Sequence, residues 1–249
     1  MSGATWAPLL AHLPDRRAIA LDLPGFGRSD ACSYAGRPLR EHAVAQLSST
    51  LDELGLQRAP IVGTSLGGMW ALCLALDRPE RVSAIVSLGM PAAALPGLRG
   101  DPFFKIMSTP FIGRLVSHGP APPSAAVARK VMAKVLGGRA LARTPDEFFE
   151  VVRVGMAQPG WGNAMWTHLN LAMRVGRARP ENVLTDDELR SITAPVQMIW
   201  GDGDVYGGPE IGRRAAGVLP DARLEIIAGG HAPFLDDPER CAELIRNAT

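Results

Sequence analysis

The stretch GTSLGG, residues 63–68, lies between two apolar runs, one of strand length before it and one of helix length after it. Its first five residues fit the pattern GxSxG, and the flanking runs predict a tight strand-to-helix turn at Ser65. Such a turn strains the backbone of the serine, so we expect small residues at Gly63 and Gly67 because side chains there would clash. The segment indicates a nucleophilic serine; the alternative is a polar residue in a glycine-rich connection.

Further apolar runs alternate with helical patterns along the chain. Several runs are nearly continuous, which is typical of strands buried on both faces of a parallel sheet. The predicted strands are Ala18–Leu23, Ile61–Val62, Val82–Leu88, Val196–Trp200 and Leu224–Ala228. Helical spacing of apolar residues predicts helices at Leu39–Leu54 and Met69–Leu76. The alternation predicts an α/β fold with a mostly parallel sheet flanked by helices.

This rhythm stops between about Pro91 and Thr193, where we expect no strands. Proline and glycine clusters separate helical patterns there, such as Ser124–Leu136 and Asp146–Met156. We predict a helical insertion at residues 92–190 in a core formed by residues 1–91 and 191–249. The insertion carries 13 Lys and Arg against 8 Asp and Glu, and the remainder 13 against 17. A solvated basic helix face explains this excess; the alternative is an attraction for anionic substrates.

Composition bounds the classes of function. The chain has 249 residues, 47% of them hydrophobic, and a formal net charge of +1. There is thus no overall electrostatic case for a nucleic acid or membrane partner, and binding to either would need a local patch. Three widely spaced cysteines, without metal-ligand spacing or a secretory leader pattern, favour a reduced, cytoplasmic location. No metal or cofactor motif is present, and the sequence leaves the oligomeric state open.

A serine hydroxyl needs a general base to become a nucleophile. His231 follows the last predicted strand, in a glycine-containing loop before the C-terminal amphipathic segment Pro238–Ile245. This setting suits a base whose ring lies over the sheet edge. The other four histidines lie in helical or insertion segments without such a setting, where we expect surface or packing roles: His12, His42, His118 and His168.

The acid of such a triad belongs at the end of a parallel strand, between nucleophile and base in the chain. WGDGD, residues 200–204, offers two aspartates. We favour Asp204, which lies farther past the strand end, and expect Asp202 to shape the turn. At the start of the helix after Ser65, the backbone N–H of Leu66 is the expected oxyanion donor.

Five segments together resemble the α/β-hydrolase fold superfamily, in its capped branch with a serine nucleophile. They are DLPGFGRSD at 22–30, GTSLGG at 63–68, PERVSAIVSLG at 79–89, WGDGD at 200–204 and GGHAPFLDDPE at 229–239. The resemblance spans nearly the whole chain except the middle, where the family carries a helical cap. It implies a nucleophile at Ser65, an acid at Asp204 and a base at His231, with a structural turn at DLPGFGRSD in which Arg28 and Ser29 stabilise the fold.

The chain departs from this family at its start. Before a segment like ATWAPLLAHL, residues 4–13, the family has two antiparallel strands and a buried strand ending in a His-Gly loop. That strand would lie between Ala18–Leu23 and Ile61–Val62, and its loop would supply a second oxyanion N–H. MSGATW, residues 1–6, resembles the interior of this loop, so our hypothesis is a misassigned start or a truncated chain. Loss of one donor costs about two to three powers of ten in turnover.

The resemblance implies hydrolysis of a small carboxylic ester through an acyl-enzyme. The alternatives are cleavage of a carbon–carbon bond in vinylogous diketone acids, which the basic insertion would suit, or non-catalytic binding of a small molecule. The insertion holds apolar residues that can roof a pocket over Ser65 or pack the insertion onto the core: Phe103, Phe104, Met107, Phe111, Trp161, Met165, Trp166 and Met173. We expect Trp161, Met165 and Trp166 to contact substrate.

Overall fold

The computed structural model describes residues 2–34, 36–100, 102–137, 141 and 144–249. Within these residues the main sheet has four strands in the spatial order β1-β2-β5-β6, and neighbouring strands are parallel. Their bounds are β1 Ala59–Thr64, β2 Val82–Leu88, β5 Val196–Gly201 and β6 Ala222–Ile227. All of β5 and nearly all of β2 is buried, as expected for central strands covered on both faces. The predicted fold class is confirmed.

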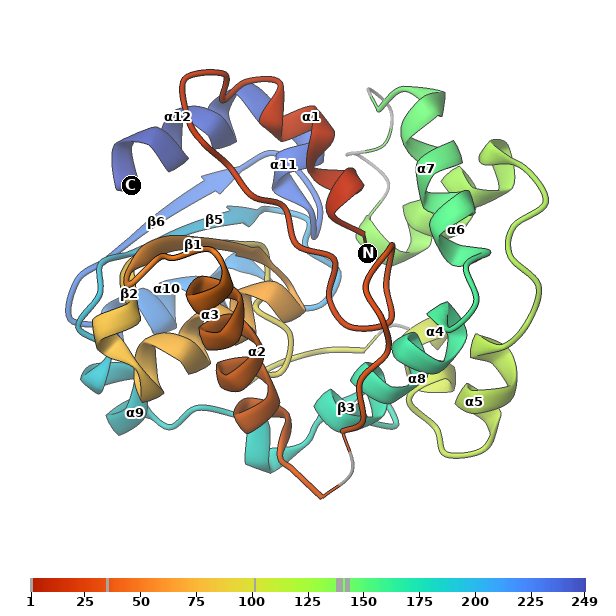
Figure 1. Cartoon of the computed structure of the whole chain (residues 1–249), viewed down its shortest axis with the longest axis horizontal. Helices are drawn as coiled ribbons and strands as arrows, with labels where there is room; N and C mark the ends of the chain where they lie inside the picture. The colour runs from red at the N-terminus through yellow and green to blue at the C-terminus, as the bar shows by residue number, and fades with distance from the viewer. Residues whose placement is uncertain (1, 35, 101, 138–140, 142–143) are drawn as a thin grey trace.

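Helices cover both faces of this sheet (Figure 1). On one face lie α2 Leu39–Glu53, α3 Leu66–Asp77, α9 Asp186–Ser191 and α10 Pro209–Val218. On the other lie α1 Ala7–Leu10, α11 Pro233–Asp236 and α12 Pro238–Ala248. Short 3-10 turns occur at Gly3–Trp6, Pro79–Arg81 and Pro180–Asn182. Each face has its own core: Trp70 belongs to the first, and Phe234, which stacks on Trp6, belongs to the second.

The segment between β2 and α9 forms a helical layer beside the sheet, on the right of Figure 1. Its helices are α4 Pro102–Met107, α5 Ile112–Ser117, α6 Ala125–Leu136, α7 Asp146–Met156 and α8 Trp161–Ala172. The prediction that this segment lacks strands misses one hairpin, β3 Met173–Arg174 with β4 Arg177–Ala178. Two-residue strands are too short to produce an alternating pattern, so the sequence carries no signal for them.

The predicted strand Ala18–Leu23 is wrong, because these residues pair with no strand of the sheet. Within the described residues, β1 pairs only with β2, so its other edge has no strand beside it. The apolar character of residues 18–23 matches a strand buried in a sheet, but a strand also needs a hydrogen-bonded neighbour. A cavity lies there instead, lined by Ala18, Ile19 and Leu21 on one side and by Ile61 and Val62 on the other.

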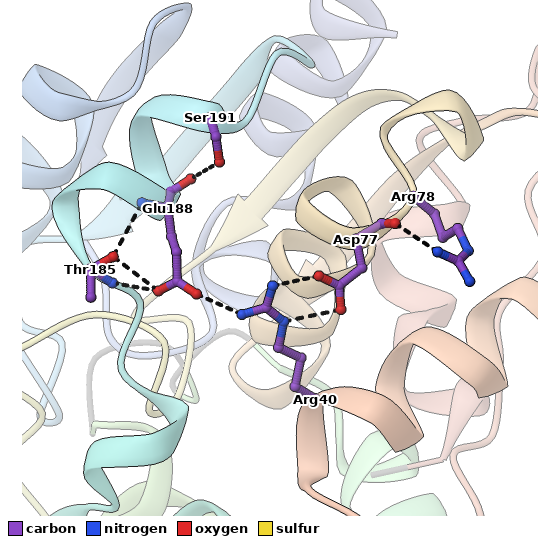
Figure 2. A network of polar contacts seen from close by, with 6 residues as sticks. All are labelled: Arg40, Asp77, Arg78, Thr185, Glu188 and Ser191. Atoms are coloured by element: carbon purple, nitrogen blue, oxygen red, sulfur yellow. Dashed lines mark hydrogen bonds and ion pairs between the residues drawn. The ribbon is translucent and has the colours of Figure 1, made fainter.

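An arginine joins three helices on the face of the sheet that α3 covers. Arg40 of α2 forms a bidentate pair with Asp77 at the end of α3, and its Nη1 lies 2.7 Å from a carboxylate oxygen of Glu188 in α9 (Figure 2). Glu188 also accepts the backbone N–H of Thr185, closing a capping box at the start of α9. That hydrogen bond and the arginine lower the pKa of Glu188. The network fixes α9, and with it the start of β5, against α2 and α3.

Candidate active site

Ser65 occupies a sharp turn between the end of β1 and the start of α3. Its φ of 51° and ψ of −114° are strained for a residue with a side chain. Gly63 is required here, because a Cβ atom at that position would overlap the backbone of Gly67. The expectation for Gly67 is wrong, since a Cβ atom there meets nothing within 4 Å, whereas Gly68 is confined by Ser87 and Pro91. The turn therefore depends on Gly63 and Gly68.

Asp204 and His231 form a buried pair beyond the ends of β5 and β6. The two Asp204 carboxylate oxygens lie 2.9 and 3.0 Å from Nδ1 of His231, and the residues are only 7% and 4% exposed. Backbone N–H groups of Met90 and Tyr206 also donate to this carboxylate, at 2.8 and 2.9 Å. Asp202 instead accepts the N–H of Gly229, and so joins the loop after β5 to the loop after β6.

These contacts set the ionisation of Asp204 and the tautomer of His231. Burial raises the pKa of Asp204, but the charge of His231 and the hydrogen bonds from His231, Met90 and Tyr206 outweigh burial, so its pKa is lowered. A carboxylate only accepts hydrogen bonds, so Nδ1 of neutral His231 carries the proton and its Nε2 keeps a free lone pair. That tautomer is the one a general base needs.

Ser65, Leu66 and His231 line the cavity that also extends along the free edge of β1, and its whole volume is about 680 Å³. No hydrogen bond joins Ser65 to His231 in the described part of the chain; in unliganded enzymes this contact is often loose until substrate binds. As the first residue of α3, Leu66 has a backbone N–H without a partner in the helix, which suits the expected oxyanion donor.

The insertion contributes much of the cavity wall. Trp161 and Met165 line it, together with Phe103, Phe104 and Met173. Trp166 does not line it, and its ring lies under the guanidinium of Arg114, 5.8 Å from the ring centroid. Met107 and Phe111, which were also expected near the pocket, lie outside its wall as well.

Met107 is buried beside Leu169 and Met173 in a small core, and Phe111 is 88% exposed. Among the described lining residues from 92 to 190, none is a Lys, Arg, Asp or Glu. The described basic residues of the insertion therefore lie outside the cavity wall.

The helical layer also contacts the loop that carries His231. The backbone N–H of His231 donates to the carbonyl of Leu136, the last residue of α6, at 2.7 Å. The ring of Tyr206 packs edge-on against His231 and against Phe104 of α4, with ring centroids 4.4 and 5.0 Å apart. The position of the imidazole thus depends on both α4 and α6.

His168 was expected to be a surface or packing residue, and it is a buried residue of α8 that also lines the cavity. Burial lowers its pKa to about 4, so the ring is neutral. Its Nδ1 lies 2.7 Å from the carbonyl of Ala164 and must donate to it, so Nε2 accepts from the hydroxyl of Tyr34 at 2.7 Å. This bond ties α8 to the segment before α2. No spacing in the sequence signals it, because its partner lies 134 residues away.

The turn at Asp22–Asp30 is structural, as the resemblance implied. Ser29 donates its hydroxyl to the carbonyl of Asp22, and the backbone N–H groups of Gly3 and Arg28 donate to the Asp22 carboxylate. Comparison of the sequence with known families gives a match over nearly the whole chain. Residues 1–244 match the model of the alpha/beta hydrolase family. The chain belongs to this family.

Relatives in the family have more than one reaction in their names. The chain is 29% identical to a pimeloyl-[acyl-carrier protein] methyl ester esterase of Aromatoleum aromaticum, over 97% of this chain and 91% of the relative. It is 27% identical to a 2-hydroxymuconate semialdehyde hydrolase of Pseudomonas putida, over 98% of this chain and 81% of the relative.

Solved structures share the fold at lower identity. A carboxylesterase of Bacillus subtilis superposes with a TM-score of 0.70 at 20% identity, covering 99% of this chain and 79% of its own. A 2-hydroxy-6-oxo-6-phenylhexa-2,4-dienoate hydrolase of a Rhodococcus species gives 0.75 at 18%, covering 99% and 85%. The chain is thus an α/β hydrolase whose relatives include esterases and carbon–carbon bond hydrolases.

No helix among the described residues is both long and apolar enough to cross a bilayer. The described histidine, cysteine and carboxylate side chains form no group of three or more that could hold a metal ion.

Proposed function

We propose that this α/β hydrolase is a serine esterase that cleaves a small carboxylic ester with an apolar acyl group. The observation that carries the proposal is the buried Asp204–His231 pair, in which His231 lines the same cavity as the strained Ser65. Ser65 is the nucleophile, His231 the general base, and Asp204 the acid that fixes the imidazole tautomer.

The reaction proceeds in two halves. Ser65 Oγ attacks the ester carbonyl carbon and its proton passes to His231 Nε2, while the Leu66 N–H stabilises the oxyanion. The C–O bond then breaks, and the alcohol leaves with the proton from His231. Water attacks the acyl-enzyme, again losing its proton to His231, and Ser65 regains a proton as the carboxylic acid departs.

The part of the cavity wall that the insertion supplies suits apolar esters, and the arginines on the wall come from the core: Arg16, Arg17 and Arg58. The described insertion residues on the wall have no cationic side chain that could pair with a second carboxylate. His168, the titratable group among them, is neutral near pH 7 because burial lowers its pKa to about 4. Aromatic and methionine side chains such as Phe103, Trp161 and Met165 suit a hydrocarbon chain.

A carbon–carbon bond hydrolase is the second candidate, because one curated relative is a 2-hydroxymuconate semialdehyde hydrolase. It would use the same triad, so the substrate decides. The test compares p-nitrophenyl acetate, butyrate and octanoate with a 2-hydroxy-6-oxohexa-2,4-dienoate, with Ser65→Ala as control. We expect ester turnover that rises from acetate to the longer acyl chains and is abolished in Ser65→Ala.

The other outcomes are distinct. Turnover of the dienoate alone would replace the esterase proposal with carbon–carbon bond cleavage. A folded chain that binds these molecules without turnover would support the non-catalytic binding role.

A further inference from the structure

The outer face of the helical layer carries exposed apolar side chains, which we call the cap patch. It consists of Ile106, Phe111, Ile112, Leu115, Val116 and Val175. Phe111 and Leu115 are 88% and 78% exposed, unusual values for large apolar side chains gathered in one place. The patch lies on α4, α5 and the β3–β4 turn, and α5 is at the periphery of the layer, away from the sheet (Figure 1).

Packing explains why these side chains face outward together. Gly113 and Ser117, on one side of α5, are buried, and a Cβ atom at Gly113 would overlap the carbonyl of Met107 at the end of α4. The opposite side of α5 therefore faces solvent. The β3–β4 turn joins the patch because the N–H of Val175 donates to the carbonyl of Ser108, directly after α4.

The chain segments that carry or adjoin the cap patch contain basic residues and no acidic ones. Residues 102–118 and 161–179 contain Lys105, Arg114, Arg174, Arg177 and Arg179 and no Asp or Glu. Arg179 lies 3.6 Å from Glu181, but the other four, all exposed, form no ion pair with a carboxylate in the described part of the chain. The net charge of +1 for the whole chain conceals this asymmetry.

We propose that the cap patch docks on an anionic lipid surface, with Phe111 and Leu115 entering the interface and Lys105, Arg114, Arg174 and Arg177 meeting the headgroups. Exposed aromatic and aliphatic side chains with basic neighbours are the combination that holds peripheral proteins at such surfaces. A second copy of the chain is a poor occupant, because a symmetric contact would bring the two cationic borders together. The proposal does not depend on the esterase reaction.

The same helix connects this surface to the cavity. Phe103 and Phe104 of α4 line the cavity wall, whereas Lys105 and Ile106, the next two residues, are exposed on the outer face. Docking through α4 would bring the roof of the cavity to the surface in which apolar esters dissolve.

Vesicle sedimentation of the full chain tests this proposal. The probes are vesicles of phosphatidylcholine alone and of equal parts phosphatidylglycerol and phosphatidylcholine, at low salt and at 0.5 M NaCl. We expect binding to the anionic vesicles that salt weakens. Phe111→Ser with Leu115→Ser should weaken it about tenfold or more, and neutralising Lys105, Arg174 and Arg177 to Gln about a hundredfold, since each charge near the surface contributes about fivefold.

The matched control replaces two exposed valines outside the patch, Val127→Ser with Val154→Ser, and should leave binding unchanged. Circular dichroism and thermal melts report whether each variant is folded. Absence of binding to anionic vesicles, or binding that the Phe111 and Leu115 replacements leave intact, would overturn the proposal. Binding to an acidic polypeptide without vesicle binding would also overturn it and assign the patch to a protein partner.

Discussion

Asp204→Asn is the change that separates a catalytic triad from a structural hydrogen bond. The carboxylate accepts three donors: the backbone N–H groups of Met90 and Tyr206 and Nδ1 of His231, all within 3.0 Å. An amide has only one oxygen, so in either orientation its NH₂ group opposes a donor. The NH₂ group also faces Nδ1 of His231, and the ring avoids that contact between two donors by moving its proton to Nε2, which removes the lone pair that Ser65 needs.

The magnitude follows from these contacts. The wrong tautomer lowers kcat by about four powers of ten in a serine triad. One buried backbone N–H left unpaired costs about 1 to 3 kcal/mol of folding free energy. The stability loss must therefore be separated from the catalytic loss.

The assay measures p-nitrophenyl butyrate turnover and urea unfolding on the same preparations, with Asp202→Asn as the matched control. Asp202 accepts the Gly229 N–H, and an amide oxygen can keep that bond, so its turnover should stay within about threefold of the parent. Turnover of Asp204→Asn within about tenfold of the parent, or equal losses in both variants, would refute the reasoning.

Three further predictions concern the turn, the pH response and the helix network. Gly63→Ala should prevent folding because of backbone overlap, whereas Gly67→Ala should leave the melting temperature nearly unchanged; equal effects in thermal melts would contradict the account of the turn. Burial raises the pKa of Asp236 to about 6. The folded chain therefore keeps a proton that the unfolded chain releases near pH 4, so the free energy of unfolding falls as pH rises from about 4 to about 6. Asp236→Asn should therefore increase the free energy of unfolding by about 1 to 2 kcal/mol at pH 7.5 and hardly change it at pH 4. Urea titrations that show the same gain at pH 7.5 and at pH 4 would contradict this explanation. Arg40→Met should lower the free energy of unfolding by about 1 to 2 kcal/mol, and a loss that 1 M NaCl does not reduce would argue against an ion-pair origin.

Local sequence patterns predicted the helices and strands whose own side chains are buried in a regular pattern. The run Val82–Leu88 is β2 without change, and Asp146–Met156 is α7, because continuous burial and helical periodicity leave direct marks in a sequence. The strand expected at Ala18–Leu23 failed for the opposite reason. Its apolar residues match a strand whose faces are buried, but a strand also needs a neighbouring strand to pair with, and the local sequence does not reveal whether one is present.

In the site, too, some features were predicted from local sequence and others were not. The turn at Ser65 and the loops of Asp204 and His231 have local signatures, and the structure brings Asp204 to His231 as expected. The insertion has no such local signature, because its composition gives its net charge but not where the charged side chains lie. Folding places the described cations of the insertion outside the cavity wall, so its basic character does not indicate a carboxylated substrate.

The most direct test of the central claim is covalent labelling of the chain with a fluorophosphonate, with the modified residue located by peptide mass spectrometry. The account predicts a single adduct at Ser65, absent in Ser65→Ala and at least about a hundredfold slower in Asp204→Asn, because phosphonylation needs the base that this carboxylate holds in place. An adduct on another residue, or no adduct on a chain that circular dichroism shows to be folded, would contradict it.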